Sequence, residues 1–135
     1  MSWEHSLVKI STYHVDVLRK RLVAIAERRM AAELGLTLLH AELEAERARG
    51  DEDAHAGWYR IGYAEGWRVR RETAESEIAA IEAEETGARD ALTAAYQELK
   101  KYEQVAEGAA RAQSLAAARR DRAAMDELGL RRAVG

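Results

Sequence analysis

The stretch that decides the fold is residues 8–46, VKISTYHVDVLRKRLVAIAERRMAAELGLTLLHAELEAE. Read in sevens from Val8, it places apolar side chains three and four residues apart, the spacing of a helix that buries one stripe. The a positions are Val8, Val15, Leu22, Arg29, Leu36 and Leu43, and the d positions are Ser11, Leu18, Ile25, Ala32, Leu39 and Glu46. Further apolar residues flank the stripe: Leu7, Ile10, Val17, Leu34 and Leu38. The pattern predicts a helix over about residues 3–54, with a stripe broad enough to suggest a third partner beyond one packed helix.

A second heptad pattern begins at Ala64 and continues for seven repeats. Its a positions are Ala64, Arg71, Ile78, Glu85, Leu92, Leu99 and Ala106, and its d positions are Trp67, Ala74, Ile81, Ala88, Ala95, Tyr102 and Ala109. The many alanines favour helix and allow two helices to approach closely. We predict a second helix over about residues 64–128, followed by a frayed end over 129–135.

The composition fits long helices and little else. The chain of 135 residues has no proline, cysteine or phenylalanine, although about 5% proline is ordinary and proline is the residue that most sharply ends helices. The absence of cysteine excludes a disulfide framework or a thiolate metal site and fits a reducing compartment. No run approaches the roughly 18 apolar residues of a membrane span, and residues 1–6 lack the apolar stretch of a signal peptide. We therefore expect an all-α, cytoplasmic protein without direct membrane insertion.

The weakest helical stretch lies between the two patterns. Gly50, Gly57, Gly62 and Gly66 fall within seventeen residues, and each glycine costs about 1 kcal/mol in a helix interior. We predict a turn over about residues 55–63. The prediction is a single domain over 1–135, a long antiparallel two-helix coiled-coil hairpin whose second helix extends beyond the first by roughly 15 residues at 1.5 Å each.

Charge along the chain is banded. Residues 9–29 hold six basic residues against two acids, residues 108–135 hold six against three, and residues 72–90 hold seven acids against one arginine. In a hairpin, both basic bands fall at the open end. We predict a basic partner-binding surface there, formed by Arg19, Lys20, Arg21, Arg119, Arg120 and Arg122. The plainer alternative is a solvated helical surface with local ion pairs.

Aromatic residues gather in the tip segment, residues 57–67, which reads GWYRIGYAEGW and holds four of the eight aromatics of the chain. Trp, Tyr and Arg are the residues enriched at binding hot spots. We predict a partner-binding tip formed by Trp58, Tyr59, Arg60, Tyr63, Trp67 and Arg71. The alternative is an aromatic plug that locks the chain reversal, which suits Trp58, Ile61 and Trp67; the two readings are compatible.

Catalytic and ligand motifs are not found. The tip glycines are not followed by the Lys-Ser/Thr of a phosphate loop, and the four histidines form no HExxH motif. Carboxylates on a solvated helix lack the enclosed pocket that shifts pKa values for acid–base chemistry. We expect no enzyme activity, cofactor or metal site, and the net charge of −3 argues against a nucleic-acid partner.

The whole chain resembles a known family. The segments that carry the resemblance are Leu-Val-Lys-Ile at 7–10, the tip segment, AYQELKKYEQVA at 95–106 and DELGLRR at 126–132. Together they resemble the FliJ family of the flagellar type III export apparatus, in its alphaproteobacterial form.

The resemblance implies a stalk-like antiparallel coiled coil, similar to the central stalk of rotary ATPases. It implies an open end inserted into the hexameric export ATPase, a tip that contacts the cytoplasmic domain of the export gate membrane protein, and escort of export chaperones. Such a protein is cytoplasmic, is recruited peripherally to the flagellar base at the inner membrane, and is needed for flagellum assembly and motility. The alternative from the residues alone is a self-associating coiled-coil scaffold or adaptor with no ATPase partner.

Overall fold

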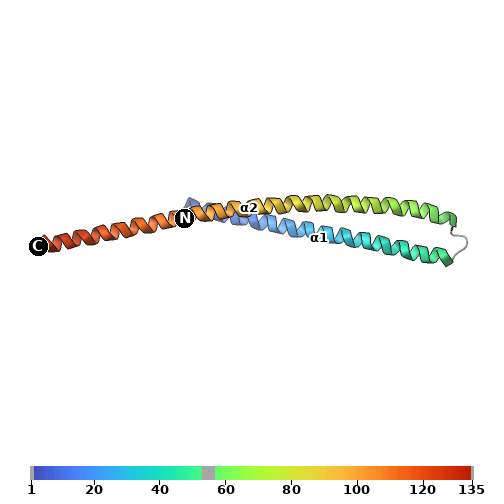
Figure 1. The fold of residues 1–135 in the computed structure, drawn as a ribbon, viewed down its shortest axis with the longest axis horizontal. Helices are drawn as coiled ribbons and strands as arrows, with labels where there is room; N and C mark the ends of the chain where they lie inside the picture. Colours follow the sequence, from blue (N-terminus) through green and yellow to red (C-terminus); the bar gives the residue numbers. More distant parts are fainter. Residues whose placement is uncertain (1, 53–56, 135) are drawn as a thin grey trace. The chain divides into compact units, whose positions relative to one another are not determined.

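Two long helices make up the protein in the computed structural model, which describes residues 2–134 apart from residues 53–56. Helix α1 spans Trp3–Glu52 and helix α2 spans Gly57–Val134 (Figure 1). Ser2 caps α1, since its Oγ accepts a hydrogen bond from the backbone N–H of His5 at 3.5 Å, and Glu4 lies in the first turn, where a negative charge is favourable. The predicted all-α hairpin is confirmed.

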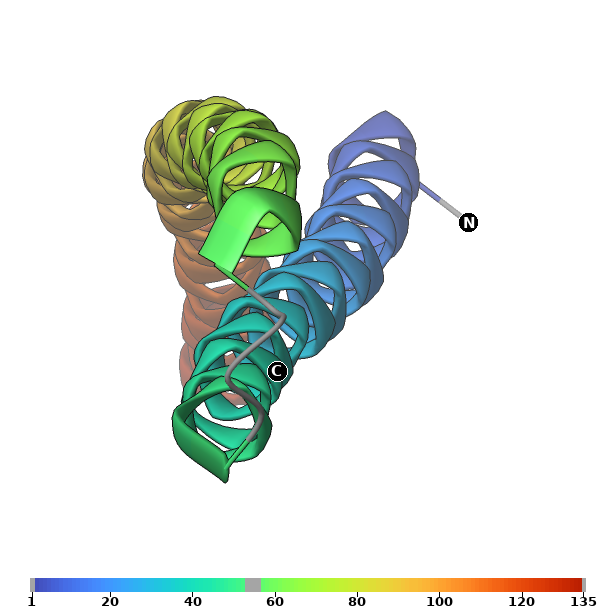
Figure 2. The same cartoon turned by 90° about the vertical axis from the view of Figure 1, so that its right-hand side faces the viewer.

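The described residues divide into two compact units, each containing part of both helices. One unit holds residues 17–92, and the other holds residues 2–16 and 93–134. In the first unit the α1 and α2 segments run side by side in both views (cyan to green and green to yellow in Figures 1 and 2). The single domain remains a prediction, and each unit is described by itself below.

The core of unit 17–92 is the predicted heptad seam. Ile25 is 2% exposed, and it packs with Ile81 and Ala88, with Leu22 and Ala32 against this cluster. Alanine at position 88 lets the helices approach closely, while the isoleucines supply most of the apolar area. The predicted a and d positions of α1 in this unit are buried or half-buried, and so are those of α2 except for Ala64, which is exposed.

Helix α2 begins earlier than the sequence pattern suggests. It starts at Gly57 instead of residue 64, so Gly62 and Gly66 lie inside the helix and residues 57–63 of the predicted turn are helical. None of the described glycines has a positive φ. The physical reason is that glycine lowers helix stability by only about 1 kcal/mol, which contacts from this turn of α2 to α1 can offset. Helix α1 ends at Glu52, close to the predicted residue 54.

The second unit pairs the start of α1 with a later part of α2. Its buried residues are Ser11, Val15 and Ala95, the last two at 2% and 3% exposure. Beyond this pairing, every residue from 110 to 134 is exposed. We call residues 110–134 the C-terminal segment; it is a single helix that continues through Gly129 to Val134, where the sequence predicts fraying. It is longer than the predicted overhang of about 15 residues because α2 begins at Gly57 instead of residue 64 and continues to Val134 instead of ending at residue 128.

Candidate partner-binding site

Trp67 anchors the first turns of α2 to α1. Its indole Nε1–H donates to the backbone carbonyl of Leu39 at 2.8 Å, and its side chain is 7% exposed. The His40 ring meets it edge-on, with centroids 5.3 Å apart, and the Arg71 guanidinium lies 5.4 Å from its ring centroid. Trp67 therefore serves the plug alternative, because a buried ring with its N–H already paired offers little surface to a partner.

Arg71 belongs to the same packed group. It is half-buried, and its Nε lies 3.9 Å from a Glu75 carboxylate oxygen, too far for a hydrogen bond. Its stacking on the indole is a cation–π contact, worth about 0.5–1 kcal/mol at partly exposed sites. This arrangement favours a packing role for Arg71 over a partner contact.

Tyr63 and Arg70 of α2 converge on Glu42 of α1. Arg70 makes a forked ion pair with both carboxylate oxygens, at 2.6 and 3.3 Å, and the Tyr63 hydroxyl donates to the same carboxylate at 3.2 Å. The Arg70 hydrogen bond lowers the pKa of Glu42 below its usual range. Desolvation of its half-buried ring, then the Glu42 charge, raises the pKa of Tyr63.

The lowered pKa of Glu42 predicts a pH-dependent contribution to stability. A carboxyl group whose pKa is depressed on folding stabilises the protein above its unfolded pKa, near 4.5, and loses that contribution as pH falls through the folded value. We expect Glu42→Gln to reduce the free energy of unfolding at pH 7, and the difference from wild type to shrink below about pH 4.5. Urea titrations from pH 3 to 7 measure this.

Glu44→Gln is the matched control, because Glu44 is 73% exposed and, among the described residues, pairs with Arg47 of its own helix at 3.4 Å. At pH 7 it should change stability by less than about 0.5 kcal/mol. A Glu42→Gln deficit that persists undiminished to pH 3 would contradict the role given to the Arg70 pair.

Arg60 is exposed, and so is Ile61, at 72%, which the plug alternative would have buried. The Arg60 guanidinium packs over Gly50, where a Cβ atom would collide with it, and donates to the Arg47 carbonyl at 3.5 Å. Trp58 and Tyr59 lie within α2, but their side chains fall outside the described residues. The structure therefore places Tyr63, Trp67 and Arg71 against α1, and the partner-binding tip remains a prediction.

The predicted basic residues fall into two groups. Arg119, Arg120 and Arg122 lie on the exposed C-terminal segment, where Arg120 Nε donates to the carbonyl of Ala116 at 3.4 Å. The second group is exposed on α1 in unit 17–92 and comprises Arg19, Lys20 and Arg21. That these two groups form one basic surface at the open end of the hairpin remains a prediction.

The charge pattern of the sequence did not predict the ion pairs that form between the two helices. Arg28 pairs with Glu84 at 3.1 Å, and Arg29 Nε donates at 2.6 Å to Glu85, which also accepts from Arg89. Part of the acidic band at 72–90 is thereby paired with the end of the basic band at 9–29. A signal was present, since Arg29 and Glu85 both occupy a positions among apolar neighbours.

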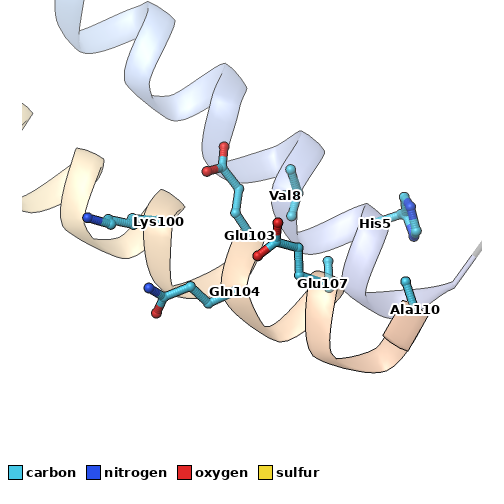
Figure 3. Close-up of a pocket in the computed structure, with 8 residues that line it drawn as sticks. His5, Val8, Lys100, Glu103, Gln104, Glu107 and Ala110 are labelled. Carbon is cyan, nitrogen blue, oxygen red and sulfur yellow. The ribbon is translucent and has the colours of Figure 1, made fainter. Parts of the chain in front are cut away.

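Unit 2–16/93–134 contains a shallow groove of about 560 Å³ where the two helices meet (Figure 3). It is lined by His5, Val8, Lys100, Glu103, Gln104, Ala106, Glu107 and Ala110. Across the described ranges, no group of three or more His, Asp or Glu side chains could hold a metal ion. The helices, as far as they are described, also contain no stretch that is both long and apolar enough to cross a bilayer.

Two long helices packed along one heptad seam define the protein as an antiparallel coiled-coil hairpin. No protein-family model matches the chain, and no solved structure matches it. Its sequence is 51% identical to the flagellar FliJ protein of Caulobacter vibrioides, in strain NA1000 and in strain CB 15 alike, over 135 residues that cover 98% of this chain and 95% of each relative. The chain therefore belongs to the FliJ family of flagellar proteins.

Proposed function

We propose that the protein is a non-enzymatic component of the flagellar type III export apparatus, which couples an export ATPase ring to the export gate and escorts export chaperones. Its place would be the cytoplasmic face of the flagellar base, and loss of the protein would impair flagellum assembly and motility. Membership of the FliJ family supports the flagellar role. The observation that carries the coupling role is the C-terminal segment.

The C-terminal segment has the properties of a partner-binding helix. It lacks a facing helix, it carries six arginines against three acids over 108–135, and Leu115, Met125 and Leu128 are each more than half exposed. Exposed apolar side chains among arginines suit an acidic socket with an apolar lining, because Coulomb attraction speeds the encounter and apolar contact holds the complex. The proposed partner for this segment is the ATPase ring.

The proposed gate contact lies at the other end of α2. Since Trp67 and Arg71 are engaged in packing, the contact is assigned to residues 58–60, with Arg60 as the exposed charge. Tyr63, the other residue of the predicted tip that is half-buried, would not contact the partner. Its hydrogen bond to Glu42 would hold the first turns of α2 in place against α1.

An ATPase assay tests the coupling role. We expect the full chain to raise the hydrolysis rate of its cognate ATPase at less than one chain per subunit. The triple variant Arg119→Glu, Arg120→Glu, Arg122→Glu should need roughly tenfold more protein for the same effect, given about 0.5 kcal/mol for each exposed charge contact.

The matched control reverses the other basic group, Arg19→Glu, Lys20→Glu, Arg21→Glu. It changes net charge by the same amount and should retain most of the stimulation if the C-terminal segment enters the ring. Equal loss in both triple variants would show a general charge effect. An absence of stimulation at every ratio would contradict the coupling function.

A further inference from the structure

Helix α1 of unit 17–92 has a second apolar face. Val23, Met30, Leu34 and Leu38 are 58%, 64%, 59% and 61% exposed, although each is a large apolar residue. At 3.6 residues per turn they lie within an arc of about 80°. We call these four residues the outer stripe.

The outer stripe lies roughly opposite the seam that holds Ile25 and Leu39, since residues of the two sets are half a turn apart around α1. It is therefore accessible while α2 stays packed. Exposed alanines lie next to the outer stripe and continue it along α1: Ala24, Ala31, Ala41, Ala45 and Ala48. An apolar face of this kind on a solvated helix, interrupted only by Glu27 between Val23 and Met30, marks an interaction surface.

We propose that the outer stripe binds the outer stripe of a second copy of this chain, with the two α1 helices antiparallel about a twofold axis at Leu34. A twofold interface must be self-complementary, and this register meets that condition. Leu34 meets the partner's Leu34, Met30 lies opposite the partner's Leu38, and Val23 lies opposite the partner's Ala45. Small residues thus face large ones at both ends.

Charges along the edges of the stripe are complementary in the same register. Arg28 and Glu42 lie on one edge of α1, with side chains 55% and 46% exposed, and each also pairs with α2, Arg28 with Glu84 and Glu42 with Arg70. An antiparallel partner centred on Leu34 places Arg28 beside the partner's Glu42, and symmetry repeats the pair. A parallel pairing in register would leave Arg28 and the partner's Glu42 fourteen residues, about 21 Å, apart along the helix axis, so this pair could not form.

The same geometry makes the dimer a weak one. The contact covers residues 20–48, roughly 40 Å of a single helix pair, which is at the small end of specific interfaces. Glu27 also lies on the stripe and faces the partner's Ala41, where its carboxylate must reach sideways to solvent. We expect a dissociation constant on the order of tens of micromolar.

Disulfide trapping tests the register, because the chain has no native cysteine. Under mild oxidation at about 100 µM, Leu34→Cys should form a covalent dimer on the axis. Val23→Cys alone should stay monomeric, whereas a mixture of Val23→Cys and Ala45→Cys should form the heterodimer. Val69→Cys, on an exposed apolar position of α2, is the control and should not cross-link.

Each other outcome overturns the proposal. Self-trapping of Val23→Cys would show a parallel pair, and trapping of Val69→Cys as fast as Leu34→Cys would show random collision. Leu34→Cys that remains monomeric would assign the stripe to a different protein.

Sedimentation equilibrium supplies a measurement that does not depend on cysteine chemistry. From 5 to 500 µM, wild type should move from monomer to dimer, and Leu34→Glu should weaken the dimer at least tenfold by facing two carboxylates on the axis. Val69→Glu is the matched control and should leave the dimer unchanged. Glu27→Leu should tighten the dimer roughly tenfold. A wild type that is monomeric at 500 µM would overturn the proposal, whatever the outcome of the ATPase assay.

Discussion

Trp67→Ala should lower the free energy of unfolding by about 3 kcal/mol, the low end of the range for a large buried aromatic side chain. The loss has two sources. The indole is 7% exposed in the seam, and removal of its ring leaves a void beside His40 and Arg71. Its N–H also pairs with the Leu39 carbonyl at 2.8 Å, a bond worth about 1 kcal/mol net.

The measurement is a urea or thermal unfolding curve followed by circular dichroism at 222 nm. For a chain of this length the midpoint temperature should fall by about 10 °C. Trp3→Ala is the matched control, because the Trp3 side chain is 64% exposed and its removal should change stability by less than about 0.5 kcal/mol. Equal stability of the two variants would show that Trp67 contributes little to packing.

The Trp67 variant also separates the two interpretations of the aromatic tip. If the ring serves as a plug, gate binding by Trp67→Ala should weaken only to the extent that the first turns of α2 unfold. If Trp67→Ala loses gate binding but keeps its full helicity, Trp67 contacts the partner directly.

The heptad pattern was sufficient to predict which residues are buried. The a and d positions predicted in α1 are all buried or half-buried, including Ser11, Arg29 and Glu46, which are polar. This succeeds because a long helix without proline has one repeating geometry, so a period of seven fixes the buried stripe without knowledge of the partner.

The register between the helices could not be predicted in the same way. A shift of α2 by one heptad against α1 keeps every seam residue in the seam. Particular pairs, such as Arg70 with Glu42 and Trp67 with Leu39, distinguish one register from the next. Those pairs depend on the residue at which α2 begins. The glycines of the tip segment predicted a turn there, so the start of α2 at Gly57 could not be predicted.

The sequence could predict which residue types gather in the candidate site, but not which of their side chains are buried or exposed. Clustering of aromatics in residues 57–67 predicted a partner-binding tip, but it could not show that Trp67 is buried while Arg60 is exposed. The two basic groups were likewise visible in the sequence, whereas the length of the unpaired C-terminal segment depends on the register.

Glu85→Lys should lower the free energy of unfolding by at least about 3 kcal/mol, because it replaces the buried carboxylate between Arg29 and Arg89 with a third cation. The Glu85 side chain is 8% exposed and accepts hydrogen bonds of 2.6 Å from both Arg29 and Arg89. The Glu85 hydrogen bond is the main cause that raises the pKa of Arg29 in the wild type. Without it the guanidinium still stays charged beside the new ammonium group, because arginine is not deprotonated in proteins. Breaking a buried pair in this way leaves an uncompensated charge in the seam.

The informative comparison is Glu85→Leu, measured in the same unfolding experiment. Leucine suits an a position, and Arg29 can keep its 3.2 Å pair with Glu33 at the solvent edge. We therefore expect Glu85→Leu to lie within about 1 kcal/mol of wild type or to be more stable, as when buried ion pairs are replaced by apolar residues. Added salt should restore part of the stability of Glu85→Lys and leave Glu85→Leu unchanged, because screening acts on charge repulsion alone. If both variants lose the same stability, the hydrogen bonds that Glu85 accepts, and not the balance of charge, stabilise this turn of the seam. The ion pairs of Glu85 would then contribute more to the stability of the register than an apolar residue at this position can replace.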